Sequence, residues 1–229
     1  SIEKVSFIIS RDPGVAGAII KVVNSAAFSL ARKIESVQEA VTLLGVDSVL
    51  SIVNAVLLKT SFSDTVDMDA LEDFWTASDD DAVAAAFLAK QLRLCKPDLA
   101  YMVGLFHDCG IPLLMQKHKN YLHLLHKIYG QNQYTHTAVE NHLFKTNHTA
   151  AGYFLSKSWN LPTVVCDVIK QHHNVELMNE QFSKGRSEYA SLLAIEKMAE
   201  QITQEYRVMG HSKESHEWPR IKERLFDYL

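Results

Sequence analysis

The chain has 229 residues and a formal net charge of −4, with 47% hydrophobic and 22% charged residues. This composition is typical of a globular protein with one large domain or two small ones. The acidic balance argues against a general nucleic-acid-binding surface. No apolar run approaches the ~20 residues of a membrane-spanning helix, and no signal peptide is evident.

Cysteine usage points to a reducing compartment. The three cysteines, Cys95, Cys109 and Cys166, lie far apart and are odd in number. They fit neither a disulfide framework nor a zinc-finger spacing. We therefore expect a cytoplasmic protein.

Helical patterns dominate the N-terminal part of the chain. The stretch VSFIIS at residues 5–10 suits a helix better than a lone strand. Ser36, followed three residues later by Glu39, forms a capping-box pattern, and Gly45 can close the helix that it starts. Asp47 or Ser48 is expected to cap the next helix. A polar link near residues 61–69 marks a weak boundary.

The later elements are also helical. Residues 68–94 predict one long helix, and its alanine-rich centre lets neighbouring helices approach closely. Asn147 is expected to cap a helix, and Pro162 suits the first turn of the one that follows. Residues 187–206 predict another long amphipathic helix. The polar stretch Asn179–Arg186 is interpreted as a loop.

The C-terminal stretch WPRIKERLFDYL places four apolar residues at helical spacing: Trp218, Ile221, Leu225 and Phe226. We interpret it as a helix that covers the core, with a partner-facing or self-association surface as the alternative.

Together these patterns predict an all-α fold. Alternating runs typical of strands are few, and no repeat of fixed period is found. We predict a bundle of about ten to twelve helices that forms one domain over residues 1–229. Within it we distinguish an N-terminal helical subregion at 1–62 from a core with C-terminal helices at 63–229.

The histidines carry the most information about function. All eleven lie at or after position 107. His107 and Asp108 stand side by side at the end of an apolar segment, where titratable groups are costly unless paired or bound to a metal. Imidazole and carboxylate suit divalent ions, although a hydrogen-bonded pair in a helical bundle also explains them. His148 opens a helix, either as a solvent-facing residue or as a third ligand.

His172 and His173 end the helix that starts near Pro162. A histidine in the last turn interacts favourably with the helix dipole, which explains one of the two. Cys109 is interpreted as a small core residue and not as a reactive thiol. The remaining histidines are interpreted as surface and packing positions: His118, His123, His126, His136, His142, His211 and His216.

The order of the segments GLFHDCGIPLL, E…NHTAAGYFLSKSWNLP and VIKQHHN resembles the HDOD family, the HD-related output domain of bacterial signalling proteins. The N-terminal half agrees, since it carries Asp12-Pro13, Asn24-Ser25 and Leu44-Gly45 in the expected order. The resemblance extends from about residue 4 to about residue 205. It implies an HD-like, all-helical bundle.

The resemblance also implies a metal site. Catalytic HD phosphohydrolases hold a metal through an upstream histidine, a His-Asp pair and a later aspartate. His107 and Asp108 match the pair, and they would be the catalytic residues of an active domain. The implied metal ligands are His107, Asp108, His148 and His172, with His173 and Glu196 as further counterparts. Iron, manganese, zinc and nickel suit these ligands about equally well.

The upstream histidine of the family pattern is missing. Ala77 stands two residues after Trp75, where that histidine would lie. The nearby trio Asp79-Asp80-Asp81 is interpreted as a solvated helix surface, since each residue turns the side chain by roughly 100° and at most one could point inward. Loss of a ligand is expected to weaken metal affinity severely.

The leading hypothesis is therefore a bacterial signal-transduction domain without catalytic activity. It would bind a protein partner or a nucleotide-like ligand through a degenerate HD metal site, and would target neither nucleic acid nor membrane. Association into a homodimer stays open.

Two alternatives remain. The first is a metal-dependent phosphohydrolase acting on a nucleotide or cyclic dinucleotide. It needs a substitute for Ala77 and cations for phosphate, and Lys145, Lys157 and Lys170 flank the histidines without forming a phosphate loop. The second is a polar core in which the histidines and the aspartate only hydrogen-bond to one another.

Overall fold

The computed structural model describes residues 2–25, 28, 30–61, 68–124, 135–204 and 215–229. Within these ranges the chain forms thirteen α-helices and no strand, which confirms the all-α prediction with slightly more helices than expected. Most of the predicted link near residues 61–69 lies outside the described residues, so the division at residue 62 stays a prediction. The helices are α1 (Ile2–Ser10), α2 (Pro13–Val23), α3 (Val37–Leu44), α4 (Val46–Ser61), α5 (Met68–Leu92), α6 (Pro97–Phe106), α7 (Gly110–Lys117), α9 (His136–Phe144), α10 (His148–Ser158), α11 (Thr163–Gln171), α12 (Val175–Lys184), α13 (Glu188–Thr203) and α15 (Trp218–Tyr228).

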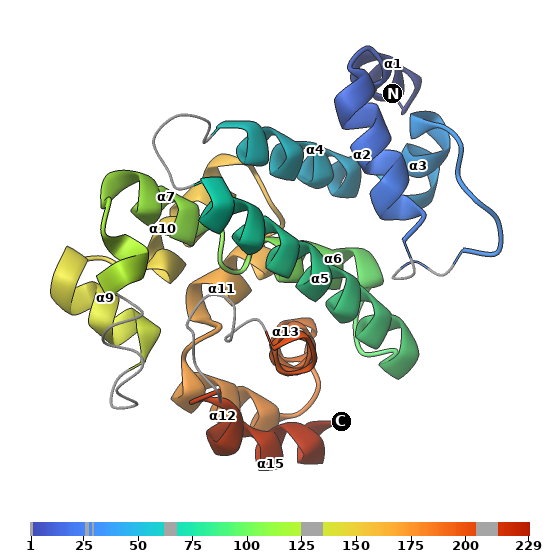
Figure 1. The fold of residues 1–229 in the computed structure, drawn as a ribbon. Helices are drawn as coiled ribbons and strands as arrows, with labels where there is room; N and C mark the ends of the chain where they lie inside the picture. The colour runs from blue at the N-terminus through green and yellow to red at the C-terminus, as the bar shows by residue number, and fades with distance from the viewer. Residues whose placement is uncertain (1, 26–27, 29, 62–67, 125–134, 205–214) are drawn as a thin grey trace.

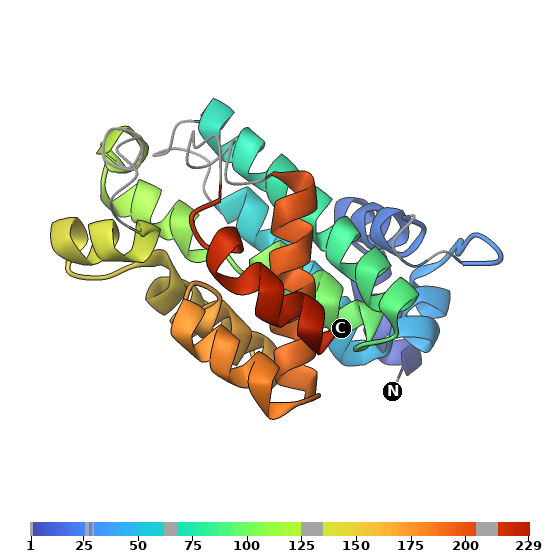
Figure 2. The same ribbon diagram turned by 90° about the horizontal axis from the view of Figure 1, so that it is seen from below.

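Helices α5 and α6 lie side by side at the centre of the molecule, and α13 packs against both (Figure 1). Helices α1–α3 pack together at one end, and α4 connects them to α6. At the other end α7 packs on α10, which also contacts α9 and α11. Figure 2 shows α15 lying along α12 and beside α13. The C-termini of α6 and α11 and the N-terminus of α10 therefore lie close together.

Side-chain caps start several helices as predicted. Ser36 Oγ accepts the backbone N–H of Glu39 at 3.2 Å, and Asn147 Oδ1 accepts that of Ala150 at 2.8 Å. Gly45 ends α3 with a φ of 83°, a conformation that glycine adopts without steric cost. These local signals place the N-terminus of α10, and hence His148, from the sequence alone.

The predicted cap of α4 is wrong. Helix α4 begins at Val46, directly after Gly45, so Asp47 and Ser48 lie inside its first turn. Ser48 Oγ instead donates a hydrogen bond to Asp98 Oδ2 at 2.8 Å. The side chain ties α4 to the first turn of α6, a tertiary contact that outweighs the local capping preference.

The predicted loop at Asn179–Arg186 is also wrong. Helix α12 continues to Lys184, and only then does Gly185 turn the chain with a φ of 98°. Val175, Met178 and Phe182 recur at helical spacing on its inner face and are buried. Burial of this apolar face stabilises the helix although the exposed face is polar.

The C-terminal helix α15 covers the core as predicted. Ile221 and Leu225 are fully buried, whereas Phe226 is 59% exposed and lies on the outer face. A partner-facing or self-association surface would therefore involve Phe226 and not Ile221 or Leu225.

No helix within the described ranges is by itself long and apolar enough to cross a membrane. The pair formed by α3 and residues Val46–Asn54 of α4 passes on length and composition alone, with a bend of 118°. In the fold, Val37, Ala40 and Val41 of this pair are buried against neighbouring helices.

Two glycines allow the closest backbone contacts around the His107-Asp108 pair. A Cβ atom on Gly104 would lie 2.7 Å from Ala82 Cα, and one on Gly110 would lie 2.0 Å from the carbonyl oxygen of His148. The first contact brings α6 against α5, and the second brings α7 against the N-terminus of α10. The pair is thus held between two points of close approach.

We expect Gly110→Ala to lower the free energy of unfolding by more than ~2 kcal/mol, because the new methyl group meets backbone that moves only if α7 and α10 separate. Urea unfolding measures the effect. Gly17→Ala on α2 is the matched control, since nothing lies within 4 Å of its Cβ position. This control should be neutral or gain up to ~1 kcal/mol. Equal stability of the two variants would contradict the expectation.

Candidate metal centre

The candidate site is formed by helix ends that converge beside the α6–α7 junction. His107 is the C-cap of α6, and Asp108 follows it. His148 is the first residue of α10, and His172 is the C-cap of α11. All four are buried, and Asp108 is the most exposed at 8%. The structure therefore brings together residues that the sequence singled out in three separate segments, and their role as metal ligands stays a prediction.

Backbone carbonyl groups orient two of the histidines. His107 Nδ1 lies 2.9 Å from the carbonyl oxygen of Gly104, and His172 Nδ1 lies 2.8 Å from that of Ile169. A carbonyl oxygen only accepts hydrogen bonds, so Nδ1 carries the proton in each ring. The neutral ring then has its lone pair on Nε2, the nitrogen that a metal would bind.

Carboxylates orient two more histidines. His148 Nδ1 lies 2.7 Å from Glu140 Oε2, which also accepts the backbone N–H of His148 at 3.1 Å. His173 Nδ1 lies 2.7 Å from Glu217 Oε1. Metal-binding histidines commonly donate their other ring N–H to a carboxylate or a carbonyl in this way.

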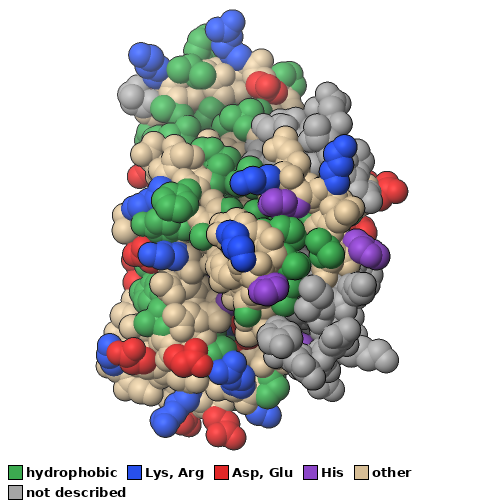
Figure 3. Space-filling view, turned by 90° about the vertical axis from the view of Figure 1, so that its left-hand side faces the viewer, with side chains coloured by type: hydrophobic (Ala, Val, Ile, Leu, Met, Phe, Trp, Pro, Cys, Tyr) green, Lys and Arg blue, Asp and Glu red, His purple; other side chains and the backbone are tan. Residues whose placement is uncertain are grey.

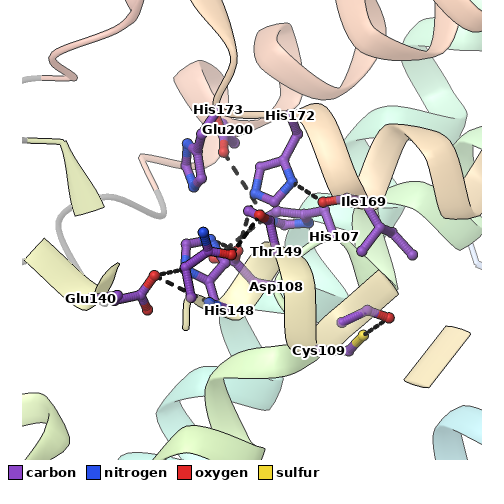
Figure 4. A network of polar contacts seen from close by, with 12 residues as sticks. His107, Asp108, Cys109, Glu140, His148, Thr149, Ile169, His172, His173 and Glu200 are labelled. Atoms are coloured by element: carbon purple, nitrogen blue, oxygen red, sulfur yellow. Dashed lines mark hydrogen bonds and ion pairs between the residues drawn. The ribbon is translucent and has the colours of Figure 1, made fainter. Parts of the chain in front are cut away.

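Asp108 lies at the centre of this arrangement (Figure 4). Its Oδ1 is 3.2 Å from Nε2 of both His148 and His172, and its Oδ2 is 3.7 Å from Nε2 of His107. Asp108, His148, His172 and His173 each offer one ligand atom, and these atoms all lie within 4.8 Å of one another. Two ligands ~2.2 Å from one ion are separated by at most ~4.4 Å, so only small adjustments would complete a coordination sphere.

A second group of buried ligand atoms adjoins the first. Nδ1 of His107 lies 3.9 Å from Asp81 Oδ2, and its Nε2 lies 3.9 Å from Glu196 Oε1. Three residues here each offer one ligand atom, and these atoms also lie within 4.8 Å of one another: Asp81, His107 and Glu196. Glu196, predicted as a counterpart of the later aspartate, therefore lies with His107 and not with the other histidines.

The interpretation of the acidic trio as a solvated surface is wrong for Asp81. Asp80 is exposed, but Asp81 is fully buried. Asp81 follows Ala77 by one helical turn, so the two residues share a face of α5. The contact between Gly104 and Ala82 turns this face toward α6 and His107. A carboxylate thus lies on the face where the family pattern expects a histidine.

The residues present fit a divalent metal. Nε2 of His173 and both carboxylate oxygens of Glu196 are buried, with no hydrogen-bond partner among the described residues. An unsatisfied buried polar group typically costs ~1–3 kcal/mol. A cation bound by imidazole nitrogen and carboxylate oxygen would remove that cost.

The charges of the site are strongly coupled. Burial alone would raise the pKa of Asp108, but His107 and His148 hold it well below its usual value. Burial lowers the pKa of His148, yet Glu140 and Asp108 outweigh that effect and raise it to about 9. Burial keeps the pKa of His172 below its usual value. His148 is therefore protonated at neutral pH when no metal competes, whereas His172 is neutral.

Lys197 supplies a buried positive charge at the edge of the centre. Its Nζ lies 2.7 Å from Glu200 Oε2, 3.0 Å from Glu217 Oε2 and 3.8 Å from Glu196 Oε2. Burial opposes the charged form, but these three carboxylates hold the pKa of Lys197 well above its usual value. The lysine is thus charged and fully engaged.

Sequence reasoning missed several of these residues. Glu140 stood in the family-like segment without a role, and Lys197 and Glu217 gave no signal that could have distinguished them. His136 was interpreted as a surface or packing residue, but its ring centroid lies 6.4 Å from that of His148 and 6.1 Å from that of His173. Its position directly after the cap Thr135 repeats that of His148 after Asn147 and was an available signal.

Other predicted positions lie outside the centre. Figure 3 shows the side on which α9 lies, where several histidine, lysine and arginine side chains are at the surface. Lys145, Lys157 and Lys170 are exposed, as is His123. Cys109 is fully buried with Sγ 3.8 Å from the carbonyl oxygen of Gly152, as expected of a core residue. His126 and His211 lie outside the described residues.

Comparison with known proteins identifies a matching family model. The family model described as HDOD domain matches residues 1–175. A curated relative from Treponema pallidum (strain Nichols), an uncharacterized protein, is 24% identical over 180 residues, which are 76% of this chain and 34% of the relative. The chain thus spans about a third of the length of that relative.

Solved structures of similar fold agree. An HDOD domain protein from Geobacter sulfurreducens has a TM-score of 0.68 and 23% identity, over 100% of this chain and 78% of that one. A Shewanella amazonensis protein named "Putative metal-dependent phosphohydrolase" has a TM-score of 0.67 and 23% identity, over 100% and 77%. The MmoQ response regulator of Methylococcus capsulatus has a TM-score of 0.50 and 20% identity, over 98% and 89%. These identities support the fold, and the match over three quarters of the sequence shows that the chain belongs to the HDOD family.

Proposed function

We propose that this domain acts in bacterial signal transduction by binding a divalent metal and, through the metal-bound form, a protein partner or small ligand that it does not hydrolyse. The observation that carries the proposal is the orientation of four histidines, each held through Nδ1 and clustered around Asp108. The similarity to a response regulator supports a role in signalling.

The residues that would hold metal form two adjoining groups. Asp108, His148, His172 and His173 would form one site, and Asp81, His107 and Glu196 the other. A bound ion of iron, manganese, zinc or nickel would offset the negative charge and, at an open coordination position, would lower the pKa of a bound water molecule. Both groups draw on the mixture of imidazole and carboxylate ligands that such ions accept.

The charge balance favours binding of a cation over binding of a phosphate ester. Six carboxyl groups surround the centre: Asp81, Asp108, Glu140, Glu196, Glu200 and Glu217. Burial and the neighbouring Glu200 raise the pKa of Glu196 well above its usual value, so the other five carry the negative charge. Lys197 is already paired with three of them. Surroundings of this charge attract metal ions and repel an anionic substrate. The exposed lysines Lys145, Lys157 and Lys170 make no ion pair with the centre among the described contacts.

The alternative function is a metal-dependent phosphohydrolase acting on a nucleotide or cyclic dinucleotide. The position of Asp81 favours it, because this carboxylate supplies a ligand on the face of α5 where Ala77 left none. Two adjacent metal sites would allow joint stabilisation of the attacking and leaving oxygens of a phosphoryl group. The name of the Shewanella protein fits the same activity.

The two functions differ in metal content and turnover. We expect the purified protein to bind at least one divalent ion and to show no turnover of bis(p-nitrophenyl) phosphate or cyclic dinucleotides in manganese or iron. His107→Ala and Asp108→Ala should each lower metal affinity by ~100-fold or more, since they remove ligands and not only the groups that orient them. Robust turnover that both variants abolish would instead establish the phosphohydrolase. Failure to bind any metal would support the hydrogen-bonded polar core.

Asp81→Asn should remove metal from the second site only. The amide keeps the size of the side chain but loses the negative charge, so affinity there should fall by ~10-fold or more while the Asp108 site stays filled. Metal content per chain, measured by mass spectrometry after dialysis against limiting metal, should fall from about two to about one. Asp80→Asn is the matched control, since Asp80 is exposed. An equal effect of the two substitutions would refute the assignment.

Metal binding at the Asp108 site should release about one proton from His148 at neutral pH. Ligation requires neutral His148, whose pKa is raised to about 9. Metal affinity should therefore rise by about tenfold per pH unit from pH 7 toward pH 9. Calorimetry in two buffers of different ionisation enthalpy measures the released proton. His142→Gln, at an exposed position, should leave the release unchanged, and affinity independent of pH would rule out His148 as the protonated ligand.

A further inference from the structure

Glu217 lies where the last helix meets the candidate metal centre. It is the residue directly before α15, its backbone oxygen accepts the N–H of Arg220 at 2.9 Å, and its side chain is buried. The HDOD match ends at residue 175, so Glu217 and Lys197 both lie beyond the matched region.

Both oxygens of the Glu217 carboxylate are engaged by residues of the centre. Oε1 lies 2.7 Å from His173 Nδ1, at the end of α11, and Oε2 lies 3.0 Å from Lys197 Nζ, on α13. One carboxylate thus joins three helices. The side chains of His173 and Glu217 are 13% and 11% exposed, so solvent weakens these contacts little.

The contact with Glu217 controls the direction of the His173 ring. A carboxylate only accepts hydrogen bonds, so the His173 ring donates Nδ1–H to Glu217 and directs Nε2 away from it. The ring lies close to the other candidate ligands, with centroids 4.1 Å from His172 and 4.9 Å from His148. Glu217 is the one acceptor recorded for this Nδ1–H among the described residues.

Helix α15 has other anchors that do not involve the centre. Ile221 and Leu225 are buried in the core, and Tyr228 Oη lies 2.8 Å from Ser191 Oγ. Arg220 is paired with Glu176 on α12 at 2.8 Å. Loss of the Glu217 carboxylate should therefore leave the helix in place while removing its link to His173.

We propose that Glu217 is a positioning residue that couples the metal centre to the C-terminal helix: the docked helix holds His173 ready for ligation, and metal bound at His173 in turn stabilises α15. The coupling must be reciprocal, because each event changes the free energy of the other by the same amount. This inference rests on the proposed metal site. It would give the domain a way to report metal occupancy at α15, where the exposed Phe226 lies beside the partly buried Trp218 with ring centroids 5.9 Å apart.

The test compares Glu217→Ala and Glu217→Gln with the control Glu223→Ala, which removes an exposed carboxylate from the same helix. Metal affinity is measured by competition with a chromophoric chelator, using Zn²⁺ or Mn²⁺ alone. We expect Glu217→Ala to weaken binding by ~10–100-fold, and Glu217→Gln to have a smaller effect because its amide oxygen still accepts from His173. Glu223→Ala should match the unsubstituted protein.

Amide hydrogen exchange supplies the readout that a merely structural role would not change. Metal should increase protection of residues 221–228 in the unsubstituted protein and in Glu223→Ala, and this increase should vanish in Glu217→Ala. In a His173→Ala background, Glu217→Ala should have no further effect on metal affinity, since the carboxylate acts through that ring. If Glu217→Ala does not fold, Glu217→Gln carries the comparison, with a smaller loss of affinity and a partial loss of the metal-dependent protection expected.

The outcomes separate the coupling from the proposed function. Metal binding with unchanged affinity and unchanged α15 protection in the Glu217 variants would overturn the coupling and leave the metal site standing. An additive effect in the His173→Ala background would also overturn it. If the unsubstituted protein binds neither metal, both the proposed site and the coupling fail.

Discussion

The arrangement of the candidate centre depends on two points where backbones meet almost without side chains between them. Gly104 presses α6 against Ala82 of α5, and Gly110 presses the start of α7 against His148 of α10. The His107-Asp108 pair lies between these points, so its two side chains face two different groups of partners. Small residues at a contact between two helices usually serve only to let the helices pack densely. Here the same close packing determines which titratable groups can reach one another.

The centre concentrates charge in a place where charge is costly. Carboxylates and histidines from α5, α6, α9, α10, α11 and α13 are buried together, and their pKa values move in opposite directions because each is set by its neighbours. Burial of unpaired ions is unfavourable by several kcal/mol each. Carbonyl, carboxylate and lysine partners offset part of that cost, yet Glu196 and His173 keep buried atoms without hydrogen bonds. A protein under no demand to bind a cation would gain stability by replacing them with apolar residues. This remaining cost is the physical argument for the proposed metal site over a structural ion-pair network.

The centre also shows how a departure from a family pattern can be compensated nearby. Ala77 removes the histidine that the HDOD resemblance implies on α5, and Asp81 presents a carboxylate from the same face one turn later. The C-terminal part of the chain adds Glu196, Lys197 and Glu217, all beyond the residues that the family model matches. A site defined from the family pattern alone would therefore lack the ligand that Asp81 supplies. It would also overlook the groups that hold His173 and balance the charge.

Local signals in the sequence were sufficient to determine the helical class and the caps at Ser36 and Asn147, and the order of the motifs that resemble the HDOD family supplied the candidates His107, Asp108, His148 and His172. Periodicity and capping depend on residues within one or two turns, so they can be recognised without coordinates. Whether Asp81, Glu140 or Glu217 faces the centre depends on how each helix is rotated and how closely it approaches its neighbour. That is decided by contacts between residues up to a hundred or more positions apart, such as Thr203 with Asp81. Only the tertiary structure could therefore separate the buried Asp81 from the exposed Asp80 and join the last helix to the histidine cluster.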